Sequence, residues 1–346
     1  MTIMVQNSSD TSWERMLKNT SSESLLLLCQ RLQLEEEWRD SMQEPSVFLE
    51  AYFLEHPESF LILLSKEDYE LLIRIWEENN FLSNEYINQQ NIVPLEKLGL
   101  IQYRHKKREI LVCEEAKNNF YFYLKSRSSR QWVDQYQKLE YAVKGMLYQC
   151  GIIELTQFYD IIINEKDSSI STLSQFRQFL IGRIELWSFL GVLKNYSNGD
   201  YYIISHEVKD RDQVFWGWVQ QEIDSFHKLS FDEAIFLGKM SGIGNWQGTK
   251  ALLSYCLQTI YDDMIAATVF VKTVLLYIQN GDSIETIFEK LESKIEMFTE
   301  EETETIHKYI DQMYWNTPIY NLKGYSRQEM IEKERNFSVV KGGKKD

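Results

Sequence analysis

The chain has 346 residues, of which 44% are apolar and 14% aromatic, and its formal net charge is −15. This length suits two or three packed domains, and the apolar content excludes a largely disordered chain. Only four prolines and 15 glycines occur, which favours a mainly helical fold over a sandwich or barrel. The longest apolar stretch, residues 265–278, contains Lys272 and is too short to span a membrane.

The four cysteines have apolar surroundings and lie far apart, at Cys29, Cys113, Cys150 and Cys256. This pattern has neither the close spacing of a zinc site nor the density of a disulfide scaffold. The first apolar run, residues 25–28, is too short for the core of a signal peptide. We therefore expect a cytoplasmic protein with buried thiols and no membrane contact.

Positive charge is concentrated in one part of the chain. Residues 101–150 hold ten basic and five acidic side chains, a net charge of +5, whereas residues 1–100, 151–230 and 231–346 carry −11, −4 and −5. Phosphate backbones repel acidic surfaces, so the total charge argues against indiscriminate binding to nucleic acid. The basic residues 101–150 are the part of the chain that suits a local contact with nucleic acid.

The N-terminal region predicts a leader followed by helices. Residues 1–20 are rich in Ser, Asn and Thr and predict a mobile leader. Ser65 precedes two acids and apolar residues at helical spacing, which predicts a helix up to Asn80. Pro94 suits the first position of a very short helix that ends at Gly99.

One sequence pattern occurs twice, 92 residues apart. Residues 98–101 match residues 190–193, and residues 110–117 match residues 202–209. Each copy has a helix-ending glycine, a short apolar strand, a polar turn and a second apolar strand. This order is typical of the second half of a winged helix.

The two copies have diverged. The first lacks a long recognition helix, but its hairpin turn is basic. The second is predicted to have helices over residues 131–149, 155–163 and 172–190, and its turn, residues 197–200, contains the Asn-Gly pair of a tight non-basic turn. A symmetric pair of DNA-reading domains is therefore disfavoured.

The rest of the chain predicts helices only, near residues 212–228, 231–240, 249–262, 264–279, 282–297 and 300–315. Ser230 and Thr299 precede acidic residues that suit helix starts. We therefore expect a mainly α fold with small β-hairpins, in which tandem winged-helix-like domains precede a C-terminal helical domain. The expected segments are a mobile leader, two winged-helix-like domains, a helical domain and a flexible tail, over residues 1–20, 21–128, 129–211, 212–336 and 337–346.

Ten polar side chains are candidates for contact with nucleic acid or a partner. The basic hairpin turn holds Arg104, Lys106, Lys107 and Arg108, and the following segment adds Lys125, Arg127 and Arg130. Cations on a hairpin turn can neutralise phosphates without reading bases, although a solvated turn that limits edge pairing fits the same residues. In the helix over residues 172–190, Arg183 and three further residues point away from the apolar stripe or along its edge. The three with the chemistry to contact base edges, or to form the wet side of a helix, are Gln175, Arg177 and Gln178.

No catalytic motif accompanies these residues. Residues 242–250 are Gly-rich, but no strand precedes them and Lys250 follows Thr249 rather than preceding Ser or Thr, so they do not form a phosphate-binding loop. The five histidines fall in different elements and lack metal-ligand spacing. No serine lies in a nucleophile elbow, and the acid clusters fit solvated helix faces. We expect a protein that is not an enzyme and binds neither cofactor nor metal.

A short C-terminal segment carries a family resemblance. Residues 315–318 (Trp-Asn-Thr-Pro), 322–326 (Leu-Lys-Gly-Tyr-Ser) and 329–330 (Glu-Met) resemble the segment before the zinc motif of poorly characterised bacterial SEC-C-containing proteins. The resemblance implies a bacterial origin and covers 16 of the 346 residues. In that group a Cys-rich tail binds metal, whereas residues 339–346 contain no cysteine, so no zinc site is carried over.

Two functional hypotheses remain. The first is a non-catalytic bacterial regulatory or interaction protein whose winged-helix-like domains dock on nucleic acid or a nucleoprotein through residues 101–130. In this reading the helical domain serves self-association or a second partner. The alternative is an acidic protein-binding module of a mobile element or phage-conflict system, which inhibits or bridges a nucleic-acid-processing protein.

Overall fold

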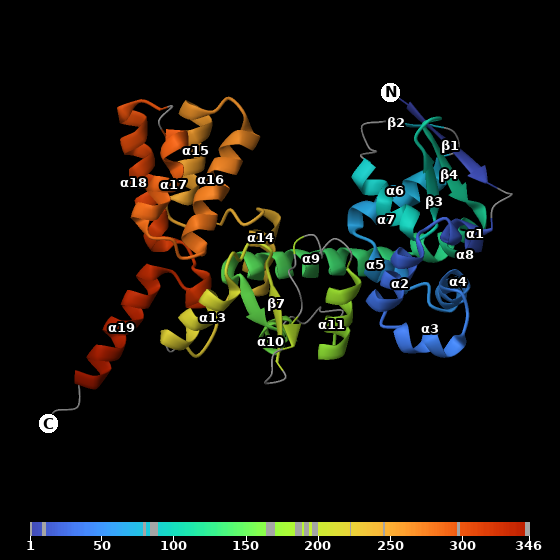
Figure 1. Ribbon diagram of the computed structural model, residues 1–346, viewed down its shortest axis with the longest axis horizontal. Coiled ribbons are helices and arrows are strands. Elements are labelled where there is room, and N and C mark those ends of the chain that lie inside the picture. The colour runs from blue at the N-terminus through green and yellow to red at the C-terminus, as the bar shows by residue number, and fades with distance from the viewer. Residues whose placement is uncertain are drawn as a thin grey trace. The chain divides into compact units, whose positions relative to one another are not determined.

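Helices make up most of the chain, and two small sheets complete it (Figure 1). The computed structural model describes all residues except 1, 9–11, 79–80, 84–88, 164–169, 184–188, 190–193, 196–199, 222, 245, 296–297 and 343–346. The chain divides into two units. Unit 1 comprises residues 1–138 and 166–188, and unit 2 comprises residues 139–165 and 189–346. These units differ from the expected domains, because the boundary falls inside a helix and residues 166–188 return to unit 1.

Unit 1 contains a four-stranded sheet and the helices packed around it. Its elements are β1 (Thr2–Ser8), α1 (Trp13–Lys18), α2 (Ser22–Arg31), α3 (Glu35–Ser41), α4 (Pro45–Glu55), α5 (Ser59–Leu63), α6 (Lys66–Glu77), β2 (Phe81–Ser83), α7 (Gln89–Lys97), β3 (Ile101–Arg104), β4 (Glu109–Cys113), α8 (Glu114–Lys125), the first half of α9 (Arg127–Cys150), and α11 (Leu173–Gly182).

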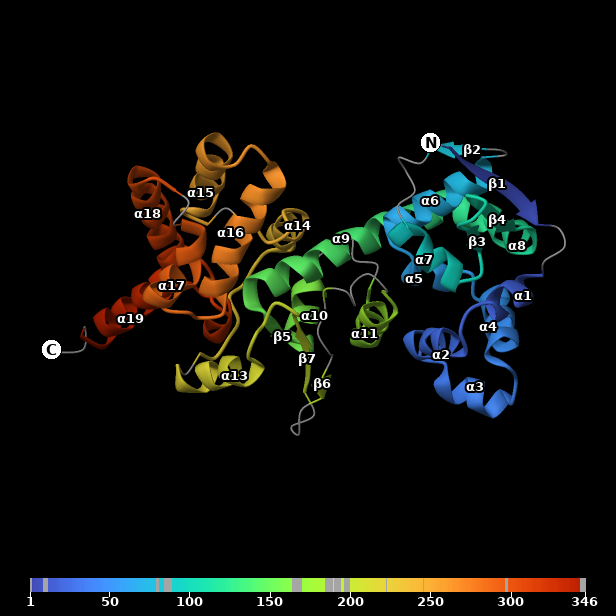
Figure 2. The same cartoon turned by 45° about the horizontal axis from the view of Figure 1, so that its top comes forward.

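The first sheet confirms the predicted hairpin and corrects the predicted leader. Its strand order is β2-β1-β4-β3, with β3 antiparallel to β4 and β1 parallel to β4 (Figure 2). Residues 2–8 are thus a strand and not a mobile leader. Ile3 and Val5 are buried on one side of β1, and this apolar alternation outweighs the polar composition of residues 1–20.

Aromatic packing holds the start of the chain in the core of unit 1. Trp13 is fully buried, and its indole Nε1 donates a hydrogen bond to the carbonyl oxygen of Leu98 at 3.0 Å. Its ring centroid lies 5.0 Å from that of Phe120, and the rings of Phe53 and Phe60 stack at 4.4 Å. The two Trp13 contacts join residues separated by about a hundred positions, which residue composition does not reveal.

The helix starts and ends of unit 1 that were predicted from local signals agree with the structure, with one exception. Ser65 caps α6 in a capping box with Asp68, as its acidic context predicted. Gly99 has a φ of +65° at the end of α7, which confirms the predicted helix-ending glycine. Pro94, however, lies inside α7 rather than at its start, so this helix is longer than predicted.

Unit 2 combines a three-stranded sheet with a helical bundle. Its elements are the second half of α9, β5 (Ile152–Glu154), α10 (Leu155–Ile163), β6 (Lys194–Asn195), β7 (Tyr201–Ile204), α13 (Arg211–Gln220), α14 (Phe231–Lys239), α15 (Thr249–Tyr255), the π-helical η2 (Cys256–Ile260), α16 (Met264–Gln279), α17 (Ile284–Ile295), α18 (Glu300–Asn316), the 3₁₀-helical η3 (Tyr320–Leu322) and α19 (Arg327–Gly342). The sheet is antiparallel, in the order β5-β7-β6.

The helix boundaries of unit 2 agree with the predicted ones at some positions and differ at others. Ser230 and Thr299 cap α14 and α18 in capping boxes, as predicted, and α16 has the predicted bounds. Helix α13 ends at Gln220, earlier than the predicted end at residue 228. Residues 337–342, predicted as flexible, continue α19. The matching residues 190–193 and most of the predicted turn at 197–200 lie outside the described residues.

The segment with the SEC-C resemblance is part of the core of unit 2. Tyr320 is fully buried, its carbonyl oxygen accepts a hydrogen bond from the Trp218 indole at 2.8 Å, and its hydroxyl donates to Gln279 at 3.2 Å. The Gln149 amide donates to the carbonyl oxygen of Gly324 at 2.6 Å. Tyr320 and Gly324 thus connect this segment to α9, α13 and α16, and their role in this structure is packing within unit 2.

Candidate nucleic-acid interface

The basic residues of the first repeat form a closed turn between β3 and β4. The amide of Lys107 donates to the carbonyl oxygen of Arg104 at 3.1 Å, and the amide of Arg108 donates to the carbonyl oxygen of His105 at 3.3 Å. Arg108 has a φ of +51°, in the left-handed region that completes the reversal. All five side chains from Arg104 to Arg108 are exposed.

The turn stands on a rigid base. Strand β4 lies between β1 and β3, and each of its five residues is buried. The amide of Met4 in β1 donates to the carbonyl oxygen of Arg108 at 3.1 Å, and the amide of Tyr103 in β3 donates to Glu96 at 2.6 Å. Residues on both sides of the turn are therefore held by hydrogen bonds, and the turn is presented from an ordered sheet.

Charge is distributed unequally within the turn. Arg104 forms an ion pair with Glu109 at 3.5 Å, and the Glu109 side chain is only 5% exposed. Within the described part of the chain, Lys106 and Lys107 form neither an ion pair nor a side-chain hydrogen bond. These two ammonium groups are therefore the cations of the turn most available to an external phosphate.

The predicted reinforcing residues lie on α8 and α9, where α6 engages part of their charge. Lys125 forms an ion pair with Glu77 of α6 at 2.7 Å, and this hydrogen bond lowers the pKa of the Glu77 carboxyl. Arg130 lines a groove of about 550 Å³ between α6 and α9, together with Lys66 and Asp134, which pair at 2.7 Å. Arg127 is exposed. The groove thus carries charges of both signs.

The candidate residues of the second repeat lie on α11, which belongs to unit 1. The side-chain oxygen of Gln175 accepts hydrogen bonds from the amide and hydroxyl of Ser171, at 2.9 and 3.0 Å, so it caps its own helix. Arg177 and Gln178 are half-buried. The ring of Phe179 stacks on Tyr136 at 5.3 Å. The packing and capping of α11 leave Gln175 little freedom to contact a base.

Arg183 was predicted to point away from the apolar stripe of its helix or along its edge, and this prediction is wrong. Its side chain is fully buried, and Nη1 donates to the carbonyl oxygens of Leu61 at 3.2 Å, Ile62 at 3.3 Å and Leu64. Burial raises the pKa of the Asp68 carboxyl, and the positive charge of Arg183 partly offsets this rise. No motif marks this residue, because its partners lie about 120 positions earlier.

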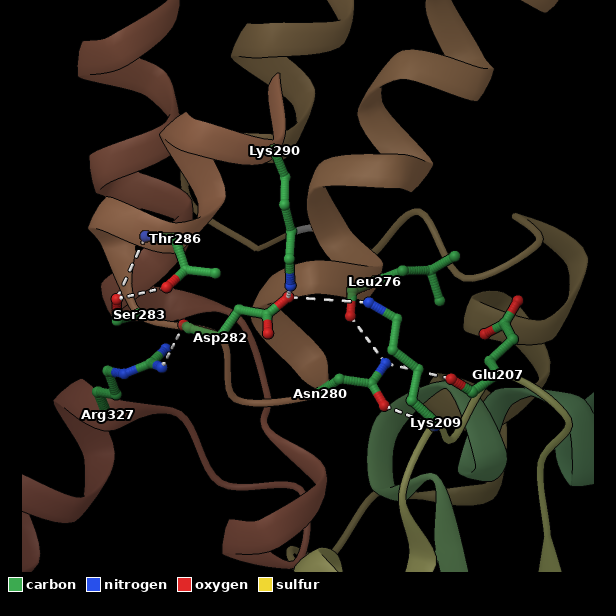
Figure 3. Close-up of polar contacts among 9 residues, drawn as sticks. All are labelled: Glu207, Lys209, Leu276, Asn280, Asp282, Ser283, Thr286, Lys290 and Arg327. Carbon is green, nitrogen blue, oxygen red and sulfur yellow. Dashed lines mark hydrogen bonds and ion pairs between the residues drawn. The ribbon is translucent and has the colours of Figure 1, made fainter. Parts of the chain in front are cut away.

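Unit 2 has a polar network of its own (Figure 3). Asp282 pairs with Lys290 at 2.6 Å and Lys209 at 3.7 Å, and the side chain of Asn280 accepts from the Lys209 amide at 2.9 Å. Asn280 also donates to the carbonyl oxygen of Glu207 at 3.1 Å. These contacts tie the segment after β7 to the end of α16, which is a structural role.

A cavity of about 450 Å³ adjoins the loop before α14, and His227 and Asp160 are among its lining residues. His227 Nε2 lies 3.0 Å from a Glu329 carboxylate oxygen. Burial alone would raise the pKa of Glu329, but hydrogen bonds from His227 and from the Ser326 amide lower it to about 2. Glu329 also caps α19 through Ser326, so this pair stabilises the end of the bundle.

Among the residues that the structure describes, His, Cys, Asp and Glu side chains do not gather in a group of three that could hold a metal ion. In the same part of the chain, the helices are too short or too polar to cross a membrane.

Comparisons with known proteins gave no match. The chain matches none of the family models, curated proteins or solved structures with which it was compared. The resemblance of residues 315–330 to SEC-C-containing proteins therefore stays a prediction.

Proposed function

We propose that this protein is a non-catalytic docking protein that contacts nucleic acid, alone or within a nucleoprotein, through the turn at residues 104–108. The single observation that carries this proposal is the exposed basic turn on the buried central strand β4. Cations on an ordered hairpin can neutralise phosphates and fix the position of a duplex without reading its bases.

The order of elements supports a winged-helix-like origin for both sheets. In the second repeat, α9, β5, α10 and α11 precede the antiparallel strands β6 and β7. In the first repeat, α6, β2 and α7 precede β3 and β4. Strand β5 pairs directly with β7, whereas β1 lies between β2 and β4. We propose that the first sheet is a wing sheet widened by β1.

The test measures duplex DNA binding over a salt series for the full chain and for the Lys106→Gln/Lys107→Gln variant. If each lysine neutralises one phosphate, the slope of log K against log salt becomes shallower by about 1.8. Glutamine removes the positive charge and keeps a flexible polar side chain, and Arg104 and Arg108, which have structural partners, stay in place. The matched control replaces the exposed Lys250 and Lys308 of unit 2 with glutamine, and its slope stays unchanged.

Two results would contradict this proposal. If the unmodified protein binds no duplex even at low salt, the nucleic-acid component is wrong. If it binds but the double variant keeps both affinity and salt slope, the turn is not the contact.

A second candidate function is binding to a basic protein partner, which one observation favours. On α16, Met264, Ile265 and Val269 are 59%, 71% and 55% exposed, directly after the exposed acids Asp262 and Asp263. Apolar side chains beside carboxylates suit a partner with apolar and cationic residues. A protein that binds no nucleic acid but forms a complex through this part of α16 would support this function.

A further inference from the structure

An aromatic ring projects into solvent from α8 in unit 1. Phe122 is 82% exposed, the largest fraction among the described phenylalanines and tryptophans with large exposed areas. Its neighbours Phe120 and Leu124 are buried, which fixes the orientation of the helix. An apolar side chain with this exposure contributes little to the core, because most of its surface stays in contact with water.

The residues that share the helix face with Phe122 are polar and carry no negative charge. Residues three and four positions away on a helix lie on the same side, and here they are Asn118, Asn119, Lys125 and Ser126. The two asparagines and Lys125 are exposed. We call these five residues the Phe122 face.

Contacts with α6 hold the Phe122 face in place. The Tyr121 hydroxyl donates to Glu77 of α6 at 3.2 Å and accepts from Lys125 at 2.8 Å. The Lys125 ammonium also lies 5.1 Å from the Tyr121 ring centroid. The Phe122 ring meets the Tyr121 ring edge-on, with centroids 5.5 Å apart. Phe122 is therefore presented from an anchored helix end.

The chemistry of these neighbours distinguishes a base from a protein partner. The centre of a protein interface is a group of apolar and aromatic side chains, whereas Phe122 contacts the single half-buried ring of Tyr121 and has polar residues at the four neighbouring helix positions. A ring offers a stacking surface to any base, asparagine amides pair with base edges, and cations attract phosphates. Lys125 is paired with Glu77, so the exposed Arg127 at the start of α9 is the cation of this region that attracts a phosphate.

We infer that the Phe122 face binds single-stranded nucleic acid, with one unpaired base stacked on the Phe122 ring. This inference rests on the proposed function, because it names the class of nucleic acid that unit 1 accepts. A paired base inside a duplex has both ring faces covered by its neighbours, so Phe122 discriminates in favour of unpaired bases.

The experiment compares the full chain with Phe122→Ala and Phe122→Tyr, using a single-stranded DNA 20-mer and the duplex of the same sequence. Loss of one base–aromatic stack weakens single-strand binding about tenfold in Phe122→Ala, and Phe122→Tyr restores it. Duplex affinity stays unchanged in both variants. Trp216→Ala, which removes a 65% exposed ring from unit 2, is the matched control and leaves single-strand binding unchanged. Equal melting temperatures show that each variant is folded.

The outcomes separate this inference from the proposed function. If the protein binds duplex through Lys106 and Lys107 but Phe122→Ala leaves single-strand affinity unchanged, only the inference is overturned. If the unmodified protein binds neither ligand, both are wrong. If Phe122→Ala changes the oligomeric state measured by light scattering and not the single-strand affinity, the ring is a protein contact and the inference is overturned.

Discussion

Individual side chains in this protein are explained more often by folding than by ligand chemistry. Lys125 pairs with Glu77, Gln175 caps α11 and Glu329 joins His227 to the start of α19. Against this background Lys106 and Lys107 stand out, because an ordered turn exposes them and no described partner engages them. Their availability makes them the sharpest targets for substitution.

The Glu329 contacts predict a pH dependence of stability. Since the folded-state pKa of about 2 lies below the ordinary 4.5, the stabilisation is fully present above pH 4.5 and is lost as the pH falls towards 2. The side chain is 41% exposed, so solvent screening limits the effect to about 1 kcal/mol. Urea unfolding should therefore show Glu329→Gln to be less stable at pH 7 and nearly equal to the parent near pH 2.

Glu301→Gln is the matched control, since it removes an exposed carboxylate on α18. If Glu329→Gln lowers the free energy of unfolding equally at pH 7 and near pH 2, the carboxylate charge is not the source of the stabilisation.

Among the helices, capping boxes mark the starts of α6, α14 and α18, while two glycines determine how closely α9 and α14 approach. Gly145 of α9 faces the carbonyl oxygen of Ala234, and Gly238 of α14 faces that of Tyr141. A Cβ atom at either glycine would overlap this backbone oxygen. The crossing of α9 and α14 in unit 2 therefore requires glycine at both positions.

Gly238→Ala tests this crossing. Alanine favours an isolated helix by about 1 kcal/mol over glycine, but a clash with the backbone of another helix cannot be relieved by a rotamer change. The helices must move apart, and overpacking of this kind costs about 1–3 kcal/mol or more. We expect a lower melting temperature in calorimetry, whereas Ser254→Ala on the exposed side of α15 leaves it nearly unchanged. A stabilised Gly238→Ala protein would disprove the close crossing.

Along the chain, the order of the segments does not follow the division into two units. Residues 166–188 come after the first part of unit 2 but belong to unit 1, where α11 packs near α2 and α5. The buried Arg183 directly follows α11 in this segment and donates to carbonyl oxygens at the end of α5. A cation there also matches the negative end of the helix dipole. Arg183 thus helps to assign its segment to unit 1.

Arg183→Met tests this assignment. The change leaves the α5 carbonyl oxygens without their donor and Asp68 buried without a nearby cation, so we expect a loss of about 3 kcal/mol in urea unfolding. Adding Asp68→Asn should recover part of the loss, because it removes the buried negative charge. Hydrogen exchange should show faster opening of α11. A loss below about 0.5 kcal/mol would mean that other contacts hold the segment.

Sequence patterns alone predict the mainly helical class, the capped starts of α6, α14 and α18, and the hairpin that carries the basic turn. These features depend on residues within a few positions of one another, such as Ser65 with Asp68, so periodicity and spacing reveal them. The pairing of β1 with β4 and the burial of Arg183 against α5 emerge only when the chain folds. Such pairings join residues about a hundred or more positions apart, and their free energy comes from burial and hydrogen bonds that no local pattern encodes.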